Sequence, residues 1–185
     1  MSTVLGRSFF ERPAPTVAKD LLGKFLVRTY GGREAAYMIT EVEAYHGVED
    51  RACHASMGQT ARNKVMWDEA GRWYVYFVYG VHWMLNIVTS KRGQPSAVLI
   101  RALQDFSSKN LGGQGDKLGG PGKLTKSLNI DGKFYGLPAN KKSGLWVEDR
   151  GFKIHASSFK TGPRVGVNYA GPYWSRRKWR FWVSQ

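Results

Sequence analysis

The chain has 185 residues, enough for one domain with a substantial hydrophobic core, so we expect a single domain spanning residues 1–185. A hydrophobic share of 42% and an aromatic share of 14% exclude a disordered chain. The 28 lysines and arginines outnumber the 14 acidic residues, and the net charge of +14 predicts an anionic partner, nucleic acid first. The sequence has no long apolar run and no basic amphipathic anchor, so we expect no membrane partner.

The cysteine content and the N-terminus bear on the compartment. Cys53 is the only cysteine, which excludes an internal disulfide and a multi-cysteine zinc site. The first residues lack the apolar core of a signal peptide. We therefore expect an intracellular protein.

The N-terminal third reads as a short helix followed by two strands. Pro13 and Pro15 precede residues 16–22 and Gly23 follows them, an order typical of a helix. Residues 24–29 and 36–45 read as strands joined by a glycine turn. Strict alternation would place four side chains of the second strand on one face, namely Ile39, Glu41, Glu43 and Tyr45.

Two carboxylates on one strand face allow more than one interpretation. A solvated strand face is the most common explanation. A Mg²⁺ site is another, although only Glu49 and Asp50 lie nearby in the sequence as further acidic ligands. A catalytic carboxylate is the third.

Residues 47–65 read as a loop with side chains suited to phosphate contacts, among them Thr60, Arg62 and Asn63. His54 also lies in this loop. Taken alone, that histidine would more simply be structural.

The stretch from residue 73 to residue 89 predicts an antiparallel hairpin. Aromatic and β-branched residues fill both halves, and Tyr79-Gly80 is the pair suited to a reversal, with Gly80 able to take a positive φ. Tyr79 would then lie at the tip, either covered by other elements or presented to a partner. Several apolar side chains are expected in the core, namely Trp73, Phe77, Trp83, Leu85 and Ile87.

The C-terminal half predicts further strands and glycine-rich loops. Residues 95–103 form an apolar strand interrupted by Arg101, which we expect to brace a carboxylate or a phosphate. Residues 104–122 read as a loop, 118–128 as a glycine-rich turn opening a helix, 145–148 and 152–155 as a hairpin, 161–173 as a loop, and 178–183 as a closing strand. The cations at residues 176–180 are either a phosphate patch or a solvated edge.

An ordered set of residues resembles the alkyladenine (3-methyladenine) DNA glycosylase family, from roughly Phe9 to the C-terminus. The set is 43–45 (Glu-Ala-Tyr), His54, 60–63 (Thr-Ala-Arg-Asn), 74–76 (Tyr-Val-Tyr), 79–80 (Tyr-Gly), Asn86, Arg101 and 164–171 (Arg-Val-Gly-Val-Asn-Tyr-Ala-Gly). No single segment is specific, but their order is. The resemblance implies a mixed α/β (α+β) domain around a curved antiparallel sheet, with a protruding hairpin that inserts into DNA.

The resemblance also implies roles for individual residues. Glu43 would be the general base and Arg101 would support it. Tyr45, His54 and Tyr76 would line the pocket that receives the flipped base. Asn86 would crowd the exocyclic amino group of guanine, and Val165 would touch the DNA or the flipped nucleotide through its backbone. Tyr79 would be the wedge in the base stack. Six more would contact DNA, namely Gly80, Val81, His82, Thr60, Arg62 and Asn63.

The implied reaction is hydrolysis alone, leaving an abasic site and starting base excision repair. Chemistry on a base inside a duplex requires that the base leave the stack. Damaged purines such as 3-methyladenine, 7-methylguanine, hypoxanthine and ethenoadenine would be released from double-stranded DNA. A carboxylate and a positioned water need no metal or cofactor, and we expect a monomer.

Two alternatives remain open at this point. A helix-hairpin-helix glycosylase would use the glycine-rich segment 118–123, with Asp131 as its catalytic aspartate. A non-catalytic basic module that stacks single-stranded nucleic acid on aromatic rings explains the charge but gives Glu43 no role.

Overall fold

One large antiparallel sheet organises the molecule. The computed structural model describes residues 2–105 and 117–184. Within them ten strands pair in the order β1-β8-β2-β3-β6-β5-β4, with β10 also on β3, β9 on β10 and β7 on β6. The strands are β1 (Thr3–Val4), β2 (Phe25–Tyr30), β3 (Arg33–His46), β4 (Trp73–Val78), β5 (His82–Thr89), β6 (Ser96–Asp105), β7 (Lys117–Gly119), β8 (Leu145–Asp149), β9 (Phe159–Gly162) and β10 (Arg180–Val183). The mixed α/β class with an open antiparallel sheet is thus confirmed.

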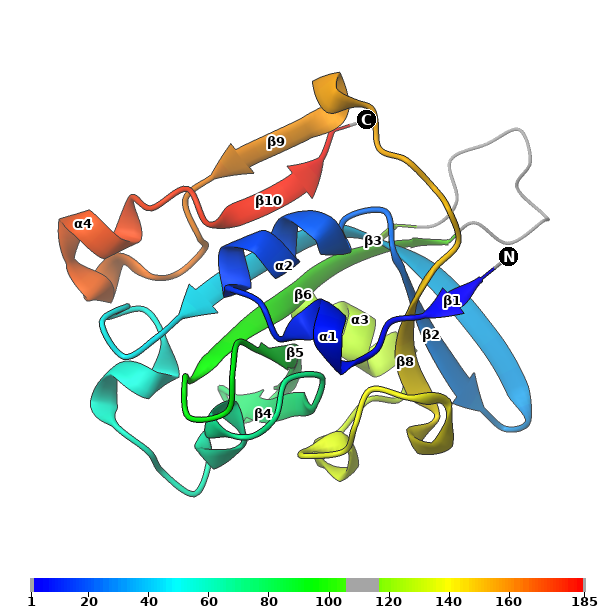
Figure 1. The fold of residues 1–185 in the computed structure, drawn as a ribbon, viewed down its shortest axis with the longest axis horizontal. Coiled ribbons are helices and arrows are strands. Elements are labelled where there is room, and N and C mark those ends of the chain that lie inside the picture. The colour runs from blue at the N-terminus through cyan, green and yellow to red at the C-terminus, as the bar shows by residue number, and fades with distance from the viewer. Residues whose placement is uncertain (1, 106–116, 185) are drawn as a thin grey trace.

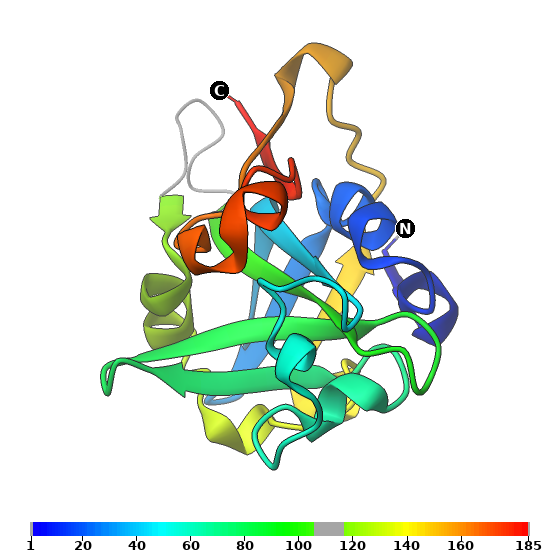
Figure 2. The ribbon, with the colours of Figure 1, turned by 90° about the vertical axis from the view of Figure 1, so that its left-hand side faces the viewer.

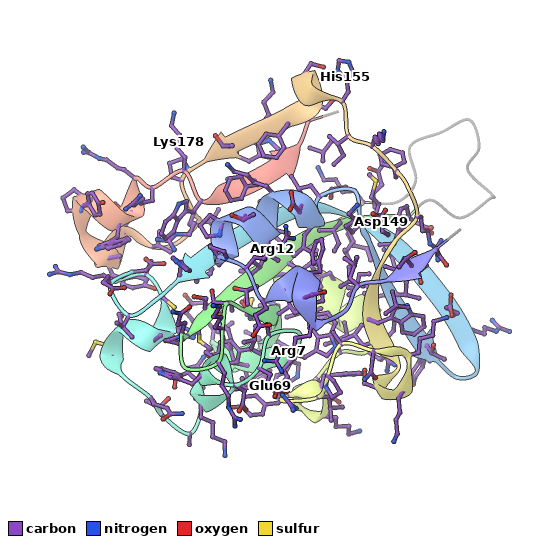
Figure 3. All side chains as sticks on the ribbon, in the orientation of Figure 1. Arg7, Arg12, Glu69, Asp149, His155 and Lys178 are labelled. Atoms are coloured by element: carbon purple, nitrogen blue, oxygen red, sulfur yellow. The ribbon has the colours of Figure 1, made fainter. Side chains whose placement is uncertain are left out.

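Short helices surround the sheet (Figure 1). They are α1 (Arg7–Phe10), α2 (Ala14–Leu21), α3 (Pro121–Ser127) and α4 (Gly171–Ser175), with 3-10 turns at His54–Met57, Lys64–Trp67, Gly132–Phe134, Lys141–Ser143, Ala156–Ser158 and Asn168–Ala170. Helices α2 and α3 pack against the sheet, and α4 lies at one end of the molecule. The predicted first helix is confirmed, beginning two residues earlier than expected because Pro15 fits its first turn. Outside the core, Arg7 of α1 pairs with Glu69 at 3.1 Å (Figure 3).

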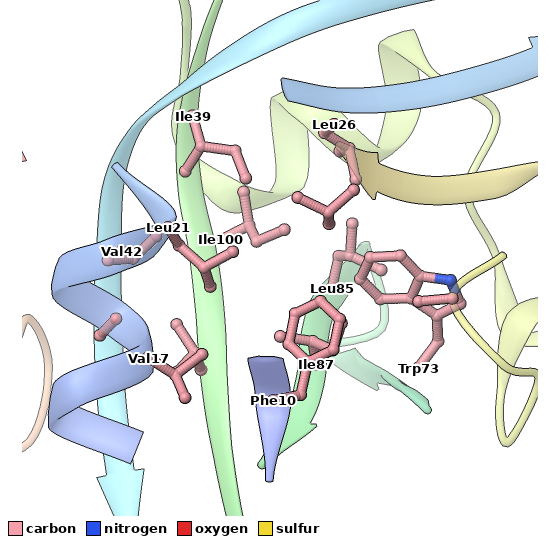
Figure 4. Packing of buried hydrophobic residues seen from close by; sticks show 14 of the residues in the cluster. Phe10, Val17, Leu21, Leu26, Ile39, Val42, Trp73, Leu85, Ile87 and Ile100 are labelled. Atoms are coloured by element: carbon pink, nitrogen blue, oxygen red, sulfur yellow. The ribbon is translucent and has the colours of Figure 1, made fainter. Parts of the chain in front are cut away.

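The central core lies between α2 and the middle strands (Figure 4). Helical spacing puts Val17 and Leu21 on one face, where both are fully buried. They pack in one cluster with Ile39 and Val42 of β3 and Ile100 of β6. These contacts fix the position of β3, the strand that carries the two glutamates.

The predicted alternation along β3 is wrong at Ile39. In the pairing with β6, Thr40 is an extra residue on β3, and one step later Arg101 is an extra residue on β6. Such bulges turn the strand, so Ile39 joins Val42 in the core and is not on the face of Glu41. The bulge also directs the side chain of Arg101 toward both glutamates.

The hairpin of β4 and β5 is confirmed and runs out from the body of the protein to its tip (Figure 2). Its turn has positive φ at both Tyr79 (51°) and Gly80 (67°), and the Val81 N–H donates to the Val78 carbonyl. This turn matches the right-handed twist of paired strands. Trp73, Leu85 and Ile87 are buried as expected, but Phe77 is 43% exposed because it lies near the tip, beyond the core.

Three predictions in the C-terminal half need correction. Residues 145–149 form β8 between β1 and β2, whereas 151–155 form no strand, so the predicted 145–155 hairpin is wrong. The predicted 104–122 loop is interrupted by the end of β6 and by β7, while its residues 106–116 lie outside the described residues. The 161–173 segment begins in β9 and ends in α4. The closing strand and the helix after the glycine-rich turn are confirmed.

Candidate active site

A cavity of about 320 Å³ opens beside the hairpin. Its volume is in the range of small-molecule sites. Its walls come from the hairpin of β4 and β5, from β3 and β6, from the 52–54 and 165–169 segments, and from Met66 and Pro121. The aromatic residues among them are Tyr45, His54, Tyr74, Tyr76, Tyr79 and Tyr169. The cavity therefore has the shape and lining to hold a flat, ring-shaped ligand.

Glu43 lies directly behind this wall. Its residue is 0% exposed, and its carboxylate accepts hydrogen bonds from three groups that line the cavity. The Val165 N–H donates to Oε1 at 2.7 Å, and the Tyr45 hydroxyl donates to Oε2 at 2.8 Å. Arg101 Nη1 reaches Oε2 from 3.4 Å. Each carboxylate oxygen is thus hydrogen-bonded to a residue that lines the cavity.

Burial raises the pKa of Glu43, and its hydrogen-bond partners only partly offset that effect. Arg101 is the largest of the opposing influences, followed by the Val165 N–H and the Tyr45 hydroxyl. A carboxylate with a raised pKa is a stronger base than an exposed one. The environment of Glu43 is therefore suited to accepting a proton.

Arg101 links the two glutamates of β3. Its Nε lies 3.2 Å from Glu41 Oε1, and Arg180 Nε approaches the same oxygen at 2.7 Å. The sequence prediction that Arg101 braces a carboxylate is confirmed. Glu41 and Glu43 share this arginine, and the described residues contain no group of three or more metal-ligating side chains.

His54 and two hairpin tyrosines form one connected aromatic wall. His54 Nδ1 shares a 2.7 Å hydrogen bond with the Tyr74 hydroxyl, and the His54 ring meets the Tyr76 ring edge-on at 4.7 Å between centroids. Burial, and secondly the charge of Arg62, lowers the pKa of His54. Both effects favour the neutral imidazole. The structure brings Tyr45, His54, Tyr76, Asn86 and Val165 to the same cavity.

Asn86 lines the cavity. It is only 3% exposed, and its amide Nδ2 donates to the Tyr74 carbonyl at 3.1 Å. This bond spans the two hairpin strands and fixes the direction of the amide. Any ligand in the cavity meets a rigid polar group at this point.

The residues of the 60–63 segment differ in exposure, so they do not all face a partner as the sequence implied. Thr60 and Arg62 are exposed, whereas Asn63 is buried. The Asn63 side chain accepts from the Thr60 N–H at 2.6 Å and donates to the carbonyls of His54 and Gly58 at 3.0 Å each. Asn63 thus uses its side chain to hold the loop. Arg62 and the exposed backbone remain available to a partner.

The hairpin tip presents its side chains to solvent. Tyr79 is 93% exposed and Val81 is 65% exposed. Gly80 and His82 are also exposed, and the His82 ring lies against Gly122 in α3. Tyr79 also lines the edge of the cavity. The most exposed ring at the tip therefore lies beside the opening that leads to Glu43.

Sequence reasoning missed the ion pair that holds the site together. Arg164 and Asp50 have fully buried side chains, and they pair through Nη1–Oδ2 at 2.5 Å and Nη2–Oδ1 at 2.8 Å. Arg164 Nη1 also donates to the Ala44 carbonyl of β3 at 2.9 Å. The pair fastens the 50s loop and the 164–167 segment to β3, which sets the Val165 N–H against Glu43. Asp50 appeared in the sequence only as a weak metal ligand.

Among residues 2–105 and 117–184, no helix is long and apolar enough to cross a membrane. The fold is built on strands, so it does not match the largely helical architecture expected of a helix-hairpin-helix glycosylase. The glycine-rich turn of that alternative instead starts α3, and Pro121 lines the cavity.

Comparisons with known proteins agree with the geometry. The family model described as "Methylpurine-DNA glycosylase (MPG)" matches residues 8–185. A relative from Methanocella arvoryzae, named "Putative 3-methyladenine DNA glycosylase", is 41% identical over 97% of this chain and 92% of its own length. A relative with the same name from Anaeromyxobacter dehalogenans is 42% identical over 98% of this chain and 86% of its own length. Another, from Legionella pneumophila, is 41% identical over 97% of this chain and 94% of its own length. The chain belongs to the methylpurine-DNA glycosylase family.

Proposed function

We propose that this chain flips a damaged purine out of duplex DNA into the cavity and hydrolyses its N-glycosidic bond with a water that Glu43 activates. Family membership already makes the chain a DNA glycosylase, a hydrolase of N-glycosyl bonds that serves DNA repair. The finer proposal concerns the mechanism, the substrates and the residues. It rests above all on one buried carboxylate, Glu43, with a raised pKa behind an aromatic cavity.

The chemical step needs a base beside the bond that breaks. A water at the cavity wall near Tyr45 and Arg101 would be within reach of Glu43 Oε2. Glu43 would take a proton from this water as its oxygen attacks C1′, and the bonding electrons would leave with the purine. The ionised carboxylate would also stabilise the positive charge that develops on the sugar. Arg101 would orient Glu43 from the cavity wall.

Recognition of the purine follows from the rings. Tyr45, His54 and Tyr76 offer aromatic surfaces to a flat base, and positively charged 3-methyladenine or 7-methylguanine gains cation–π attraction there. Neutral hypoxanthine and ethenoadenine would rely on stacking and hydrogen bonds. The fixed amide of Asn86 would crowd the exocyclic amino group of guanine, and Val165 would contact the flipped nucleotide.

The partner we propose is duplex DNA, bound by the chain as a monomer. The net charge of +14 favours phosphate contacts. Tyr79, at the end of a protruding hairpin, would fill the gap that the flipped base leaves. Gly80, Val81, His82, Thr60 and Arg62 would lie along the same DNA face, and Asn63 would support that face by shaping its loop. An enzyme with this substrate would act inside the cell, where DNA is.

The decisive experiment compares base release by the native protein and Glu43→Gln in single-turnover reactions on duplexes carrying hypoxanthine or 3-methyladenine. We expect Glu43→Gln to lose a factor of about 100 or more in rate while duplex binding persists, because general-base catalysis is worth roughly that much. The matched control is Glu148→Gln. Glu148 is also buried (3% exposed) and paired with an arginine, Arg150, at 2.7 Å, but it lies on β8 away from the cavity.

The control should release the base at close to the native rate. Equal losses in both variants would remove Glu43 as the base. If no protein released a base yet all bound nucleic acid in a salt-sensitive way, the non-catalytic binding module would be the better description.

A second experiment tests the wedge with Tyr79→Asn. Asparagine tolerates the positive φ that Tyr79 adopts, so this change removes the ring and keeps the turn. The fluorescence of 2-aminopurine placed beside the lesion reports on base flipping. We expect the equilibrium constant for flipping to fall about tenfold, since stacking of one ring is worth roughly 1–3 kcal/mol. An unchanged flipping signal would exclude Tyr79 as the wedge.

A further inference from the structure

Each of two tyrosines that line the cavity has an arginine guanidinium stacked on its ring. The Arg164 guanidinium carbon lies 4.8 Å from the centroid of Tyr45, and that of Arg62 lies 4.8 Å from the centroid of Tyr76. Neither arginine lines the cavity, so each stacks on its ring from outside. Both rings are therefore already in contact with one cation before a ligand arrives.

The charges of these two arginines are balanced differently. Arg164 is fully buried and forms a bidentate pair with Asp50. Arg62 is exposed, and its Nη2 donates to a neutral group, the carbonyl of Phe77, at 3.0 Å. Burial lowers the pKa of His54 and the Arg62 charge adds to that effect, whereas burial raises the pKa values of Tyr74 and Tyr76 and the Arg62 charge partly offsets the rise. Its field thus reaches three groups of the cavity wall.

A cation behind a ring changes what the ring attracts on its free face. A purine stacked on Tyr76 would have the Arg62 guanidinium on the opposite side of the same ring. If the purine is cationic, like-charge repulsion through the ring opposes the cation–π attraction, and at such separations the two effects are of similar size. If the purine is neutral, the repulsion is absent and the stacking remains.

Resting on the proposed function, we propose that Arg62 is a specificity-determining residue that shifts this enzyme away from cationic purines and toward neutral ones. Its guanidinium backs Tyr76, cancels much of the ring's preference for positive charge, and leaves shape and hydrogen bonding to select the base. Arg164 fixes Tyr45 in place with its charge balanced by Asp50, so it contributes little to this selection.

The test measures the ratio of kcat/KM for 7-methylguanine to that for hypoxanthine, with both lesions competing in one duplex context. Loss of phosphate contacts affects both substrates alike and cancels in the ratio. We expect Arg62→Gln to raise the ratio about three- to tenfold, because it removes the repulsion felt only by the cationic base. Arg62→Lys, which keeps the positive charge and so the repulsion, should leave the ratio within about twofold of native.

Arg51→Gln is the charge-matched control. Arg51 is exposed and lines a neighbouring hollow together with Arg62. Removing its charge should leave the ratio unchanged. An unchanged ratio in Arg62→Gln, as would follow if a DNA phosphate neutralises Arg62, overturns the proposal, and so does an equal rise in Arg51→Gln. Failure of the native protein to release either base would instead contradict the proposed function.

Discussion

Two fully buried carboxylates lie a few residues apart in the sequence and are held in different ways. Asp50 accepts two short bonds from Arg164 and one each from the backbone N–H groups of Ala52 and His46. Glu43 is held mainly by neutral donors, and its arginine stays 3.4 Å away. Charge-assisted bonds in a bidentate pair fix the geometry of Asp50. At Glu43 burial outweighs the hydrogen-bond partners and raises the pKa, so this carboxylate takes up a proton more readily. Asp50 thus positions the site, and Glu43 is suited to act in it.

Replacing Asp50 should have the largest effect on stability. Asp50→Asn leaves Arg164 with an uncompensated buried charge, and we expect a loss of about 3–5 kcal/mol in the free energy of unfolding. Chemical denaturation measures it. The control is Asp149→Asn, because Asp149 pairs with Lys24 at 2.5 Å but is 36% exposed. That change should cost less than about 1 kcal/mol. Similar losses in both variants would contradict the structural role of Asp50.

Removing the Tyr45 hydroxyl should have a smaller effect, on the pKa of Glu43. Tyr45→Phe removes a hydrogen bond that lowers the pKa of Glu43, so the carboxyl should protonate at higher pH. One such bond to a charged group is worth roughly 1.5–3 kcal/mol, enough to shift the acid limb of the rate profile upward by about one pH unit or more. Tyr74→Phe, which removes a hydroxyl bonded to His54, should leave the Glu43 limb where it is.

The smallest effect should be a stabilising one. Burial raises the pKa of Glu43, so its ionised form destabilises the fold, and glutamine at this position resembles the protonated form. Glu43→Gln should therefore melt at a higher temperature than the native protein above the raised pKa. The difference should shrink as the pH falls through that pKa and vanish below the ordinary value of 4.5. A variant that is less stable at every pH would show that Glu43 is a structural carboxylate like Asp50.

Local signals in the sequence predicted the elements that carry the chemistry. The Tyr79-Gly80 turn and its two strands depend on residues close in the chain, and so does the first helix. The resemblance identified the residues around the cavity. The Asp50–Arg164 pair joins residues 114 positions apart, and no local pattern announces such a contact.

Strand irregularities were also beyond local reasoning. The extra residues Thr40 and Arg101 belong to the pairing of β3 with β6, and they moved Ile39 to the other face. Phe77 looked like a core residue from its type, but its exposure depends on how far the hairpin extends past the body. The apolar 152–155 segment resembles a strand, yet β2 and β1 take both edges of β8. Tertiary pairing decided each case.

The most direct test of Glu43 as the ionised base is the pH dependence of single-turnover release of 7-methylguanine. This base already carries a positive charge, so its departure needs no proton and adds no acid-promoted step. We predict that the native rate falls about tenfold per pH unit on the acid side of a midpoint above 4.5, and that Glu43→Gln lacks this limb. A native rate that stays constant to below pH 4.5, or an identical limb in Glu43→Gln, would contradict the account.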